Sequence, residues 1–283
     1  MNWKFYPSSF KYEQMYIDLG GPWAGHKYFG YDLVRNFKPK KIVELGTHLG
    51  CSLFSFAQAV QDEKLNTQLD AIDTWQGDKH AGAYDELIFS KVKEIKKACY
   101  PKVKIHLIRK TFDEASREYP NNSIDLLHID GLHDYKMVKH DYETWFNKVK
   151  KDGIILLHDT AVKKWGFGVY KLFEEIQKDL ETIEFDYSHG LGVVFKDPQV
   201  YQELKDIASF LPFYYSLRAE KEQLEWDFNK QKQILTELEW DFNKQKQTLI
   251  EYEQQLTKIK SSRPYKLWQA YRRVKNLLIS KKL

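Results

Sequence analysis

Acidic and imidazole side chains follow two apolar segments in the middle of the chain, at the point where each segment ends. SIDLLHIDGLHDY carries Asp130 and His133, and GIILLHDT carries His158 and Asp159. Carboxylate oxygens hold hard divalent ions, and imidazole accepts a proton near neutral pH. A hydroxyl group is a poor nucleophile until it is deprotonated, so this set would activate an alcohol. A lone strand-end Asp or His is more commonly a helix cap or a satisfied hydrogen-bonder, and the pairing of two segments favours the catalytic interpretation.

A glycine-bracketed turn follows an earlier apolar segment, IVELGTHLGCS. Glu44 ends the segment, Gly46 and Gly50 bracket the turn, and Thr47 and His48 lie within it. Glycines let a ligand approach the backbone closely. The spacing differs from the G-x-G-x-x-G pattern that holds a pyrophosphate, and the acidic residue favours an uncharged or cationic ligand. S-adenosylmethionine, which carries a sulfonium and an ammonium group, fits this description, and a plain strand-to-helix turn is the alternative.

Three further residues could contribute to a ligand site. Asp73 ends the next apolar segment, LDAID, where open α/β sheets place the acid that accepts hydrogen bonds from ribose hydroxyls. Capping of the following helix is an equal alternative. Trp23 and His26 precede the first strand and could form a lid or an acceptor wall, although packing of a helix on the sheet explains these rings slightly better.

The elements that must position these residues are short strands alternating with helices, over residues 1–197. Strand-like segments are expected at 41–46, 69–73, 103–108, 123–130 and 153–159, with helical periodicity at 51–60, 83–98 and 135–150. This alternation predicts an α/β domain with a Rossmann-like parallel sheet and helices on both faces. TIEFDY and LGVVFKD, which lie either side of a short turn, predict a closing antiparallel hairpin. Ligands of such sheets bind outside the carboxyl ends of the strands, where the strand-end residues named above would lie.

Residues 198–260 have a different character and predict a coiled coil. The ten residues LEWDFNKQKQ occur twice, at 224–233 and 238–247, a period of two heptads. Apolar residues continue from Leu224 to Ile259 at spacings of four and three, with Gln231 and Gln245 in the seam. A single amphipathic helix folded back on the domain would show the same stripe, but the strict periodicity favours a partner helix. A homo-oligomer formed through the coiled coil is the simplest outcome.

The tail, residues 261–283, predicts a basic amphipathic helix. It contains seven basic residues and no acidic ones, with Trp268 and Tyr271 among its apolar side chains. Such a helix suits an anionic membrane surface, and an acidic partner protein is the main alternative. The formal net charge of the whole chain is only +4, and base-stacking loops are not evident, so we expect no nucleic-acid partner.

Composition limits the class and the location of the protein. The chain has 283 residues, of which 42% are hydrophobic and 15% aromatic, which excludes a wholly disordered chain. It has no apolar run long enough to span a bilayer, its N-terminus lacks the apolar core of a secretory signal, and two cysteines make no disulfide scaffold. We therefore expect a cytoplasmic protein with structural thiols, peripheral at the inner face of the membrane if its tail binds lipid.

Several consecutive motifs over about residues 19–196 resemble the class I S-adenosylmethionine-dependent methyltransferases, in the sugar and small-molecule O-methyltransferase branch that includes macrolide-sugar O-methyltransferases and cephalosporin hydroxylase-like proteins. They are GGPWAGHKYFGYDL, IVELGTHLGCS, AIDTWQGDKHAGAY, TFDEA, IDLLHIDGLHDYKMVKHDYETW, GIILLHDT and HGLGVVF. The resemblance implies a seven-stranded sheet, a cofactor over Glu44 to Gly50, and its ribose at Asp73.

The same resemblance implies roles for the residues at the strand ends. In metal-dependent relatives the Asp of the D-G-x-H motif binds Mg²⁺ and the His is the general base, which correspond to Asp130 and His133, and the acid on the next strand corresponds to Asp159. His158 stands where those relatives carry another carboxylate. Because imidazole is a weaker partner for Mg²⁺, the departure leaves metal dependence open, with Asp130, Asp159 and His158 as the candidate ligands.

These observations predict an S-adenosylmethionine-dependent O-methyltransferase that acts on a hydroxyl of a sugar or of a cell-surface glycan precursor. Two other functions stay open from the sequence. One is a nucleotide-dependent oxidoreductase or hydroxylase on the same scaffold. The other is a non-catalytic coiled-coil scaffold protein of a glycan-assembly complex.

Overall fold

The computed structural model describes residues 3–15, 21–78, 82–83 and 86–280. Residues 19–20, 79–81 and 84–85 of the motifs above, and the last three residues of the basic tail, lie outside this description. The chain divides into two compact units, Met1–Lys221 and Glu222–Leu283, which we describe separately. Among the described residues, no helix combines the length and the apolar character needed to cross a bilayer.

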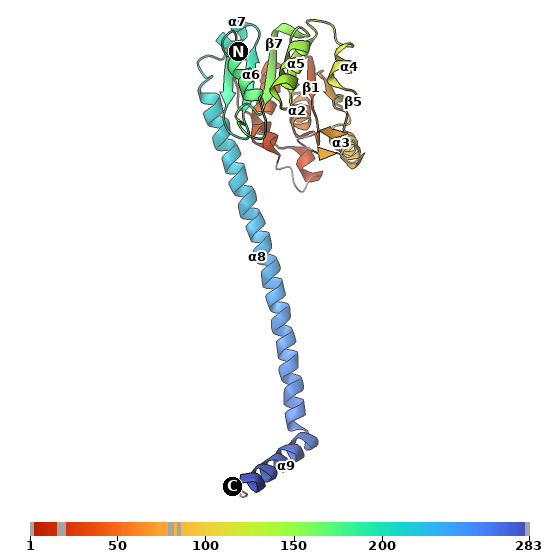
Figure 1. Ribbon diagram of the computed structural model, residues 1–283, viewed down its shortest axis with the longest axis vertical. Coiled ribbons are helices and arrows are strands. Elements are labelled where there is room, and N and C mark those ends of the chain that lie inside the picture. Colours follow the sequence, from red (N-terminus) through yellow and green to blue (C-terminus); the bar gives the residue numbers. More distant parts are fainter. Residues whose placement is uncertain (1–2, 16–20, 79–81, 84–85, 281–283) are drawn as a thin grey trace. The chain divides into compact units, whose positions relative to one another are not determined.

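The first unit is built on a seven-stranded sheet in the order β5-β2-β1-β6-β7-β9-β8 (Figure 1). The strands are β1 (Lys41–Leu45), β2 (Gln68–Ile72), β5 (Lys104–Ile108), β6 (Ile124–Ile129), β7 (Val149–His158), β8 (Glu181–Phe185) and β9 (Leu191–Phe195). β5, β2, β1, β6 and β7 run parallel, and β9 pairs antiparallel with both β7 and β8. The predicted Rossmann-like sheet and its closing hairpin are confirmed. The strand order reverses between β1 and β6, which is where open α/β sheets bind ligands.

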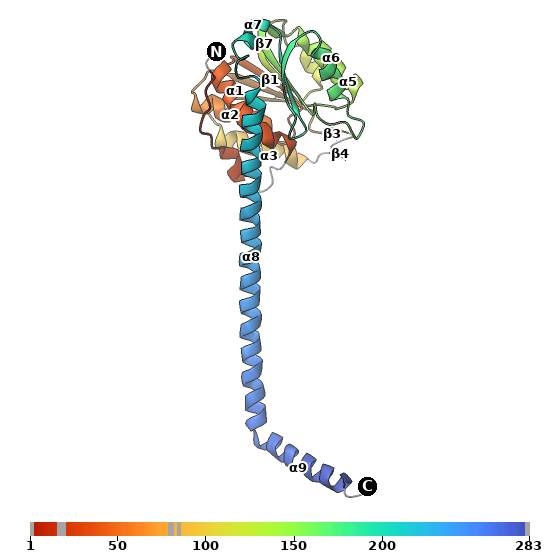
Figure 2. The same cartoon turned by 90° about the vertical axis from the view of Figure 1, so that its left-hand side faces the viewer.

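Helices cover both faces of this sheet (Figure 2). One face is covered by the helices α1 (Lys27–Phe37), α2 (Cys51–Asp62) and α3 (Glu86–Cys99), together with the 3-10 turns η1 (Lys11–Met15) and η2 (Pro22–His26). The other is covered by α4 (Phe112–Ser116), α5 (Tyr135–Phe146) and α6 (Val169–Ile176). A two-stranded ribbon, β3 (Gly77–Asp78) and β4 (Gly82–Ala83), follows β2.

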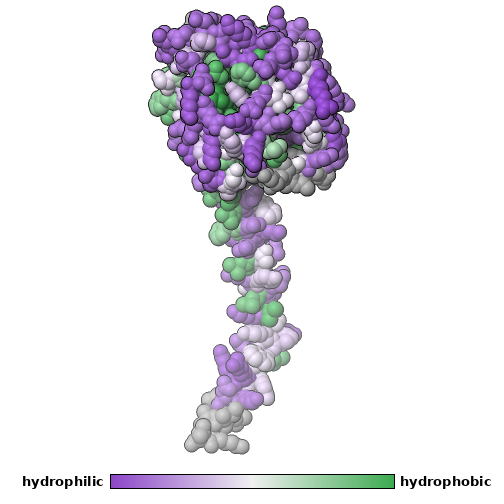
Figure 3. All heavy atoms as spheres, turned by 45° about the horizontal axis from the view of Figure 1, so that its top comes forward, coloured by the Kyte–Doolittle hydropathy of each residue, from purple (hydrophilic) through white to green (hydrophobic). Residues whose placement is uncertain are grey.

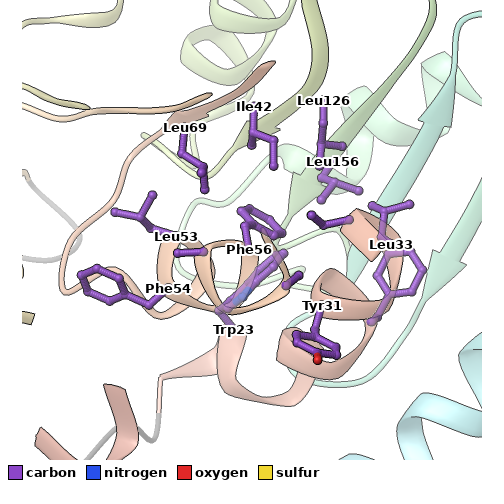
Figure 4. Close-up of a cluster of buried hydrophobic side chains, with 14 of the residues drawn as sticks. Trp23, Tyr31, Leu33, Ile42, Leu53, Phe54, Phe56, Leu69, Leu126 and Leu156 are labelled. Atoms are coloured by element: carbon purple, nitrogen blue, oxygen red, sulfur yellow. The ribbon is translucent and has the colours of Figure 1, made fainter. Parts of the chain in front are cut away.

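Alternation along β1 decides which side chains reach each layer. Ile42 belongs to the core cluster on the α1–α2 face, whereas Val43 and Leu45 belong to the cluster on the opposite face. On the first face, Phe56 of α2 lies directly beneath the strand residues and beside Trp23 (Figure 4). Glu44 lies between Val43 and Leu45 on β1, so the same alternation points its side chain toward α2 and the interior.

Residues 198–221 form the last part of the first unit and pack on its core. α7 (Pro198–Gln202) is followed by α8 (Phe210–Ser261), and Leu204, Leu211 and Tyr215 are buried in the core. The Tyr215 hydroxyl donates to Asp32 Oδ2 at 2.5 Å and lies 3.3 Å from Trp3 Nε1. The domain boundary predicted at residue 197 therefore falls before the last segment that contributes to this core. In the second unit, α8 continues to Ser261 and α9 spans Arg263–Ser280.

Candidate active site

The register of four neighbouring strands brings the predicted residues to one level. Leu45 of β1 pairs with Ile72 of β2 and with Ile129 of β6, and Ile129 pairs with Leu157 of β7. The residues that come next, Gly46, Asp73, Asp130 and His158, therefore leave the sheet side by side. A cavity of about 890 Å³ opens at this edge. Of the predicted residues, it is lined by Gly46, Thr47, His48, Gly50, Asp73, Asp130, His133, His158 and Asp159.

Close approach of two backbone segments explains the first glycine of the turn. Gly46 has a φ of 88°, and a Cβ placed there would lie 2.0 Å from the carbonyl oxygen of Asp130. The Asp130 amide donates to the Leu45 carbonyl at 2.8 Å. His48 and Gly50 also have positive φ, at 49° and 85°. The turn after β1 thus rests directly on the turn after β6, and a side chain at Gly46 would push the two apart.

Asp73 fixes the glycine turn from the neighbouring strand. Its Oδ2 accepts from the amides of Thr47 and His48, both at 2.9 Å, and its Oδ1 accepts from the Trp75 amide at 2.7 Å. The helix cap considered above does not form, because β3 follows rather than a helix. A carboxylate has about four acceptor positions, so Asp73 keeps capacity for a further donor in the cavity. Contact of Asp73 with a ribose stays a prediction.

Glu44 lies behind the turn and does not line the cavity. Its side chain is 1% exposed, accepts a hydrogen bond from the Ser52 hydroxyl, and lies 3.1 Å from His128 Nδ1. The cause is the alternation of β1, which points this carboxylate toward α2. Its position favours support of the turn over the direct contact with a cofactor that we expected.

The four catalytic candidates meet in one cluster. His133 Nε2 lies 2.8 Å from Asp159 Oδ2 and 3.7 Å from Asp130 Oδ1. His158 Nδ1 lies 3.2 Å from Asp130 Oδ1 and 3.2 Å from Asp159 Oδ2. The His133 ring stacks on Phe167, with the ring centres 4.3 Å apart and an angle of 3° between the planes. Both carboxylates therefore lie close to the imidazoles of His133 and His158.

The charges in this cluster stabilise one another. Burial opposes a positive charge on both rings, but the hydrogen bonds and charges of Asp130 and Asp159 outweigh it and raise the pKa of His133 to about 9 and that of His158 to about 10. Burial likewise opposes ionisation of the two acids, yet the imidazoles hold the pKa of each carboxyl well below its usual range. Near pH 7 the cluster therefore holds two cations and two anions.

Three of these side chains could hold a metal ion. Asp130, His133 and Asp159 each offer one ligand atom, and these atoms all lie within 4.8 Å of one another. Two carboxylates and one imidazole suit a divalent ion, although Mg²⁺ prefers oxygen ligands throughout. His158, which we expected as the third ligand, instead directs Nδ1 toward both carboxylates. The candidate metal ligands that the structure brings together are therefore Asp130, Asp159 and His133, with His133 in place of His158.

The sequence reasoning missed His189. Its Nδ1 lies 3.0 Å from Asp159 Oδ1, and its side chain lines the cavity and is 38% exposed. The motif HGLGVVF carried a signal for it, because His189 precedes the strand predicted to close the sheet. β9 pairs with β7 so that Leu191 faces His158, which places the preceding turn beside the cluster.

Trp23 and His26 take different roles. Trp23 lines the cavity and packs on His128, with the ring centres 4.4 Å apart. His26 is fully buried, and burial lowers the pKa of His26 to about 3. His26 therefore stays neutral, with Nε2 3.1 Å from the Ser188 carbonyl oxygen. It belongs to the packing of η2 on the sheet.

The strand order and the glycine turn define a Rossmann-like α/β fold. Comparison with known proteins agrees: residues 43–160 match the family model described as a methyltransferase domain. Over 211 residues the chain is 40% identical to the uncharacterized protein y4gI of Sinorhizobium fredii, an alignment that covers 75% of this chain and 22% of that protein. The chain thus spans about a fifth of the length of the curated relative it matches.

Solved structures that are similar to this one include the following two methyltransferases. The O-methyltransferase TomG of Streptomyces achromogenes, in complex with SAM, is 14% identical, with a TM-score of 0.45 over 65% of this chain and 84% of that one. The SAH-bound methyltransferase PaMTH1 of Podospora anserina is 15% identical, with a TM-score of 0.47 over 60% of this chain and 77% of that one.

Proposed function

We propose that the first unit transfers the methyl group of S-adenosylmethionine to a hydroxyl oxygen of a sugar or of a glycan precursor. The observation that carries this proposal is that one cavity is lined both by the glycine turn, Gly46–Gly50, and by the cluster of Asp130, His133 and Asp159. The match of residues 43–160 to a methyltransferase domain supports the class of reaction. No contact described above favours an oxidoreductase or a non-catalytic scaffold.

The chain's own groups would position the donor and the acceptor. The turn Gly46–Gly50, which lines the cavity, would hold the donor, and Asp73 would accept hydrogen bonds from its ribose. The acceptor hydroxyl lies toward His133 and the two carboxylates. Holding the oxygen, the methyl carbon and the sulfur in line supplies most of the acceleration.

The transfer is a displacement at the methyl carbon. A carbon–oxygen bond forms as the carbon–sulfur bond breaks, and S-adenosylhomocysteine leaves with a neutral thioether sulfur. The hydroxyl proton passes to the neutral imidazole of His133, a form that the ring reaches by first releasing its own proton to solvent, because the pKa of His133 is raised to about 9. Asp159, 2.8 Å from His133 Nε2, orients the ring. A divalent ion held by Asp130, His133 and Asp159 would supply positive charge that lowers the pKa of a bound hydroxyl. If such an ion occupies His133 Nε2, the imidazole of His189, 3.0 Å from Asp159 Oδ1, is another proton acceptor that lines the cavity.

Incubation with labelled S-adenosylmethionine and a panel of sugars and lipid-linked glycan precursors, with and without a chelator, tests donor, acceptor and ion together. We expect His133→Ala to lose turnover and to retain its affinity for S-adenosylhomocysteine. His106→Ala is the matched control, because His106 pairs with Asp70 on β2 and does not line the cavity. Transfer by His133→Ala at the parental rate would remove this residue from the mechanism.

Equilibrium binding separates the classes of function. Micromolar affinity for S-adenosylhomocysteine without affinity for NAD fits a methyltransferase, and the reverse fits an oxidoreductase. Binding of neither compound fits a scaffold protein and would overturn the proposal.

The basic helix α9 supports a lipid-linked acceptor. Leu267, Trp268 and Tyr271 are between 50% and 71% exposed, and the described part of the helix has basic but no acidic residues. We propose that α9 binds anionic lipid, since charge and apolar burial act together on such helices. Cosedimentation should be strong with phosphatidylglycerol vesicles and weak with phosphatidylcholine vesicles. Arg272→Glu with Arg273→Glu should abolish it, and equal binding to both lipids would contradict the proposal.

A further inference from the structure

The second unit presents a stripe of exposed apolar side chains on α8, which no other described residue of that unit covers. Every apolar residue of this seam is between 52% and 66% exposed: Leu224, Phe228, Leu235, Leu238, Phe242, Leu249, Tyr252, Leu256 and Ile259. Hydrophobic residues recur along the visible surface of the helix (Figure 3). Contiguous exposed apolar surface of this kind marks an interaction site.

We propose that a second copy of this chain covers the seam, in a two-stranded coiled coil whose helices are parallel and in register. The spacing of four and three fixes the heptad positions. The a positions hold Phe228, Leu235, Phe242, Leu249 and Leu256, and the d positions hold Leu224, Gln231, Leu238, Gln245, Tyr252 and Ile259.

The two glutamines of the seam select the parallel orientation. In an antiparallel pair, each d residue faces an a residue of the other helix, and every a position from 228 to 256 is Phe or Leu. Gln231 and Gln245 would then be buried against apolar groups, which costs free energy for each unmade hydrogen bond. In a parallel pair in register, each glutamine meets its own copy. An amide both donates and accepts, so the two can bond to each other.

The charged residues that flank the seam attract their counterparts on the second copy when the two helices are parallel and in register. In parallel helices, a g residue faces the e residue of the next heptad on the other helix. Asp227 then faces Lys232 of the second copy, and Asp241 faces Lys246. Two-fold symmetry doubles these to four attractive contacts. The other g positions of the seam hold Ile, Thr and Gln, so no like charges meet there; Glu220 and Glu225 would meet just before it.

The same charges fix the register. The e positions alternate between Glu and Lys from residue 225 to residue 260. A shift by one heptad in either direction therefore places Asp227 and Asp241 opposite glutamates, and it sets both glutamines against Leu or Tyr. A shift by two heptads restores the charges but leaves two heptads of each seam uncovered. A two-stranded core also suits the glutamine layers, because each amide still reaches water beside the seam.

The test uses the full chain, whose mass is 33.8 kDa, in sedimentation equilibrium at micromolar concentration. We expect the parent protein to be a dimer. Asp227→Lys with Asp241→Lys turns four attractive contacts into four repulsive ones, and the dissociation constant of the dimer should rise about 100-fold. Gln233→Lys with Gln247→Lys, at outward-facing f positions, is the control and should remain dimeric.

Adding Lys232→Glu and Lys246→Glu to the two aspartate changes should restore the dimer. This charge swap separates the orientations, because in an antiparallel pair e positions face e positions. The swap leaves only acidic residues at the five e positions from 225 to 253, so an antiparallel dimer would dissociate. Circular dichroism checks that each variant remains helical.

Oxidative crosslinking gives an independent measurement of register. Gln231→Cys should form a disulfide between two copies, whereas Gln233→Cys and the parent protein with its natural thiols should not. A monomeric or trimeric parent, a charge swap that fails to restore the dimer, or no crosslink from Gln231→Cys would overturn the proposal.

Discussion

Asp159→Asn is the sharpest test of how the charged cluster is held together. The Asp159 side chain is 4% exposed and contacts three imidazoles, at 2.8 Å from His133, 3.2 Å from His158 and 3.0 Å from His189. An amide has nearly the same shape but cannot carry the negative charge. His133 and His158 would then share the single carboxylate of Asp130, and one of them must give up its proton.

The size of the effect follows from the pKa of His133. The two carboxylates raise this pKa from 6.5 to about 9 against the effect of burial, and one pKa unit corresponds to about 1.4 kcal/mol. Because the pKa is raised on folding, the stabilisation is fully present below the unfolded value of 6.5 and is lost as the pH rises through about 9. We expect Asp159→Asn to lower the free energy of unfolding by about 3 kcal/mol at pH 6, and by less at pH 10.

The assay is urea unfolding followed by near-ultraviolet circular dichroism, at one protein concentration and with a chelator present. Asp152→Asn is the matched control, since Asp152 lies on β7, the strand that leads to Asp159. Asp152 is exposed, and the change should alter stability by less than about 0.5 kcal/mol. A loss below about 1 kcal/mol at pH 6, or an equal loss at pH 6 and pH 10, would refute the electrostatic argument.

Three further substitutions test neighbouring parts of the cavity. Gly46→Ala should weaken S-adenosylhomocysteine binding at least about 10-fold by calorimetry, whereas Gly166→Ala, also at positive φ but with nothing within 4 Å, should not. Burial raises the pKa of Asp141 from 3.8 to about 7, so the protein loses stability as the pH rises between these values. Asp141→Asn should therefore raise the free energy of unfolding by on the order of 3 kcal/mol at pH 8, measured by urea unfolding. His158→Asp should raise Mg²⁺ affinity at least about 10-fold in titration calorimetry, and His140→Asp, which brings the same charge to the cavity wall, should not.

The sheet could be predicted because its signals are local. Each parallel strand is a short apolar run between polar turns, and the alternation of strands with helices permits few topologies. The convergence of Asp130 and His158 follows from the same logic, since residues after paired strand ends leave the sheet together. The sequence predicted where these side chains would meet, and the paired register of β6 and β7 places them there.

The exact contacts could not be predicted, because they depend on backbone angles that the residue types permit but do not require. Asp159 has a φ of 65°, in the left-handed region that Asp tolerates, and nothing in GIILLHDT indicates it. Its amide donates to the Gly190 carbonyl, which brings His189 to the carboxylate. Local backbone geometry also sets the inward direction of the Glu44 side chain. It likewise sets the three hydrogen bonds that Asp73 accepts from backbone amides.

His158 supplies positive charge between the carboxylates of Asp130 and Asp159. Asp130 and Asp159 would repel each other in the interior, and a single imidazole nitrogen lies 3.2 Å from an oxygen of each. In relatives with a third carboxylate at this position, the resemblance implies a metal ion that supplies the balancing charge. Here the protein supplies that charge from its own side chain, and the hydrogen bonds of His158 occupy lone pairs that an ion would otherwise use. The pairing of His158 with both carboxylates therefore holds Asp130 and Asp159 in place through the protein's own charge.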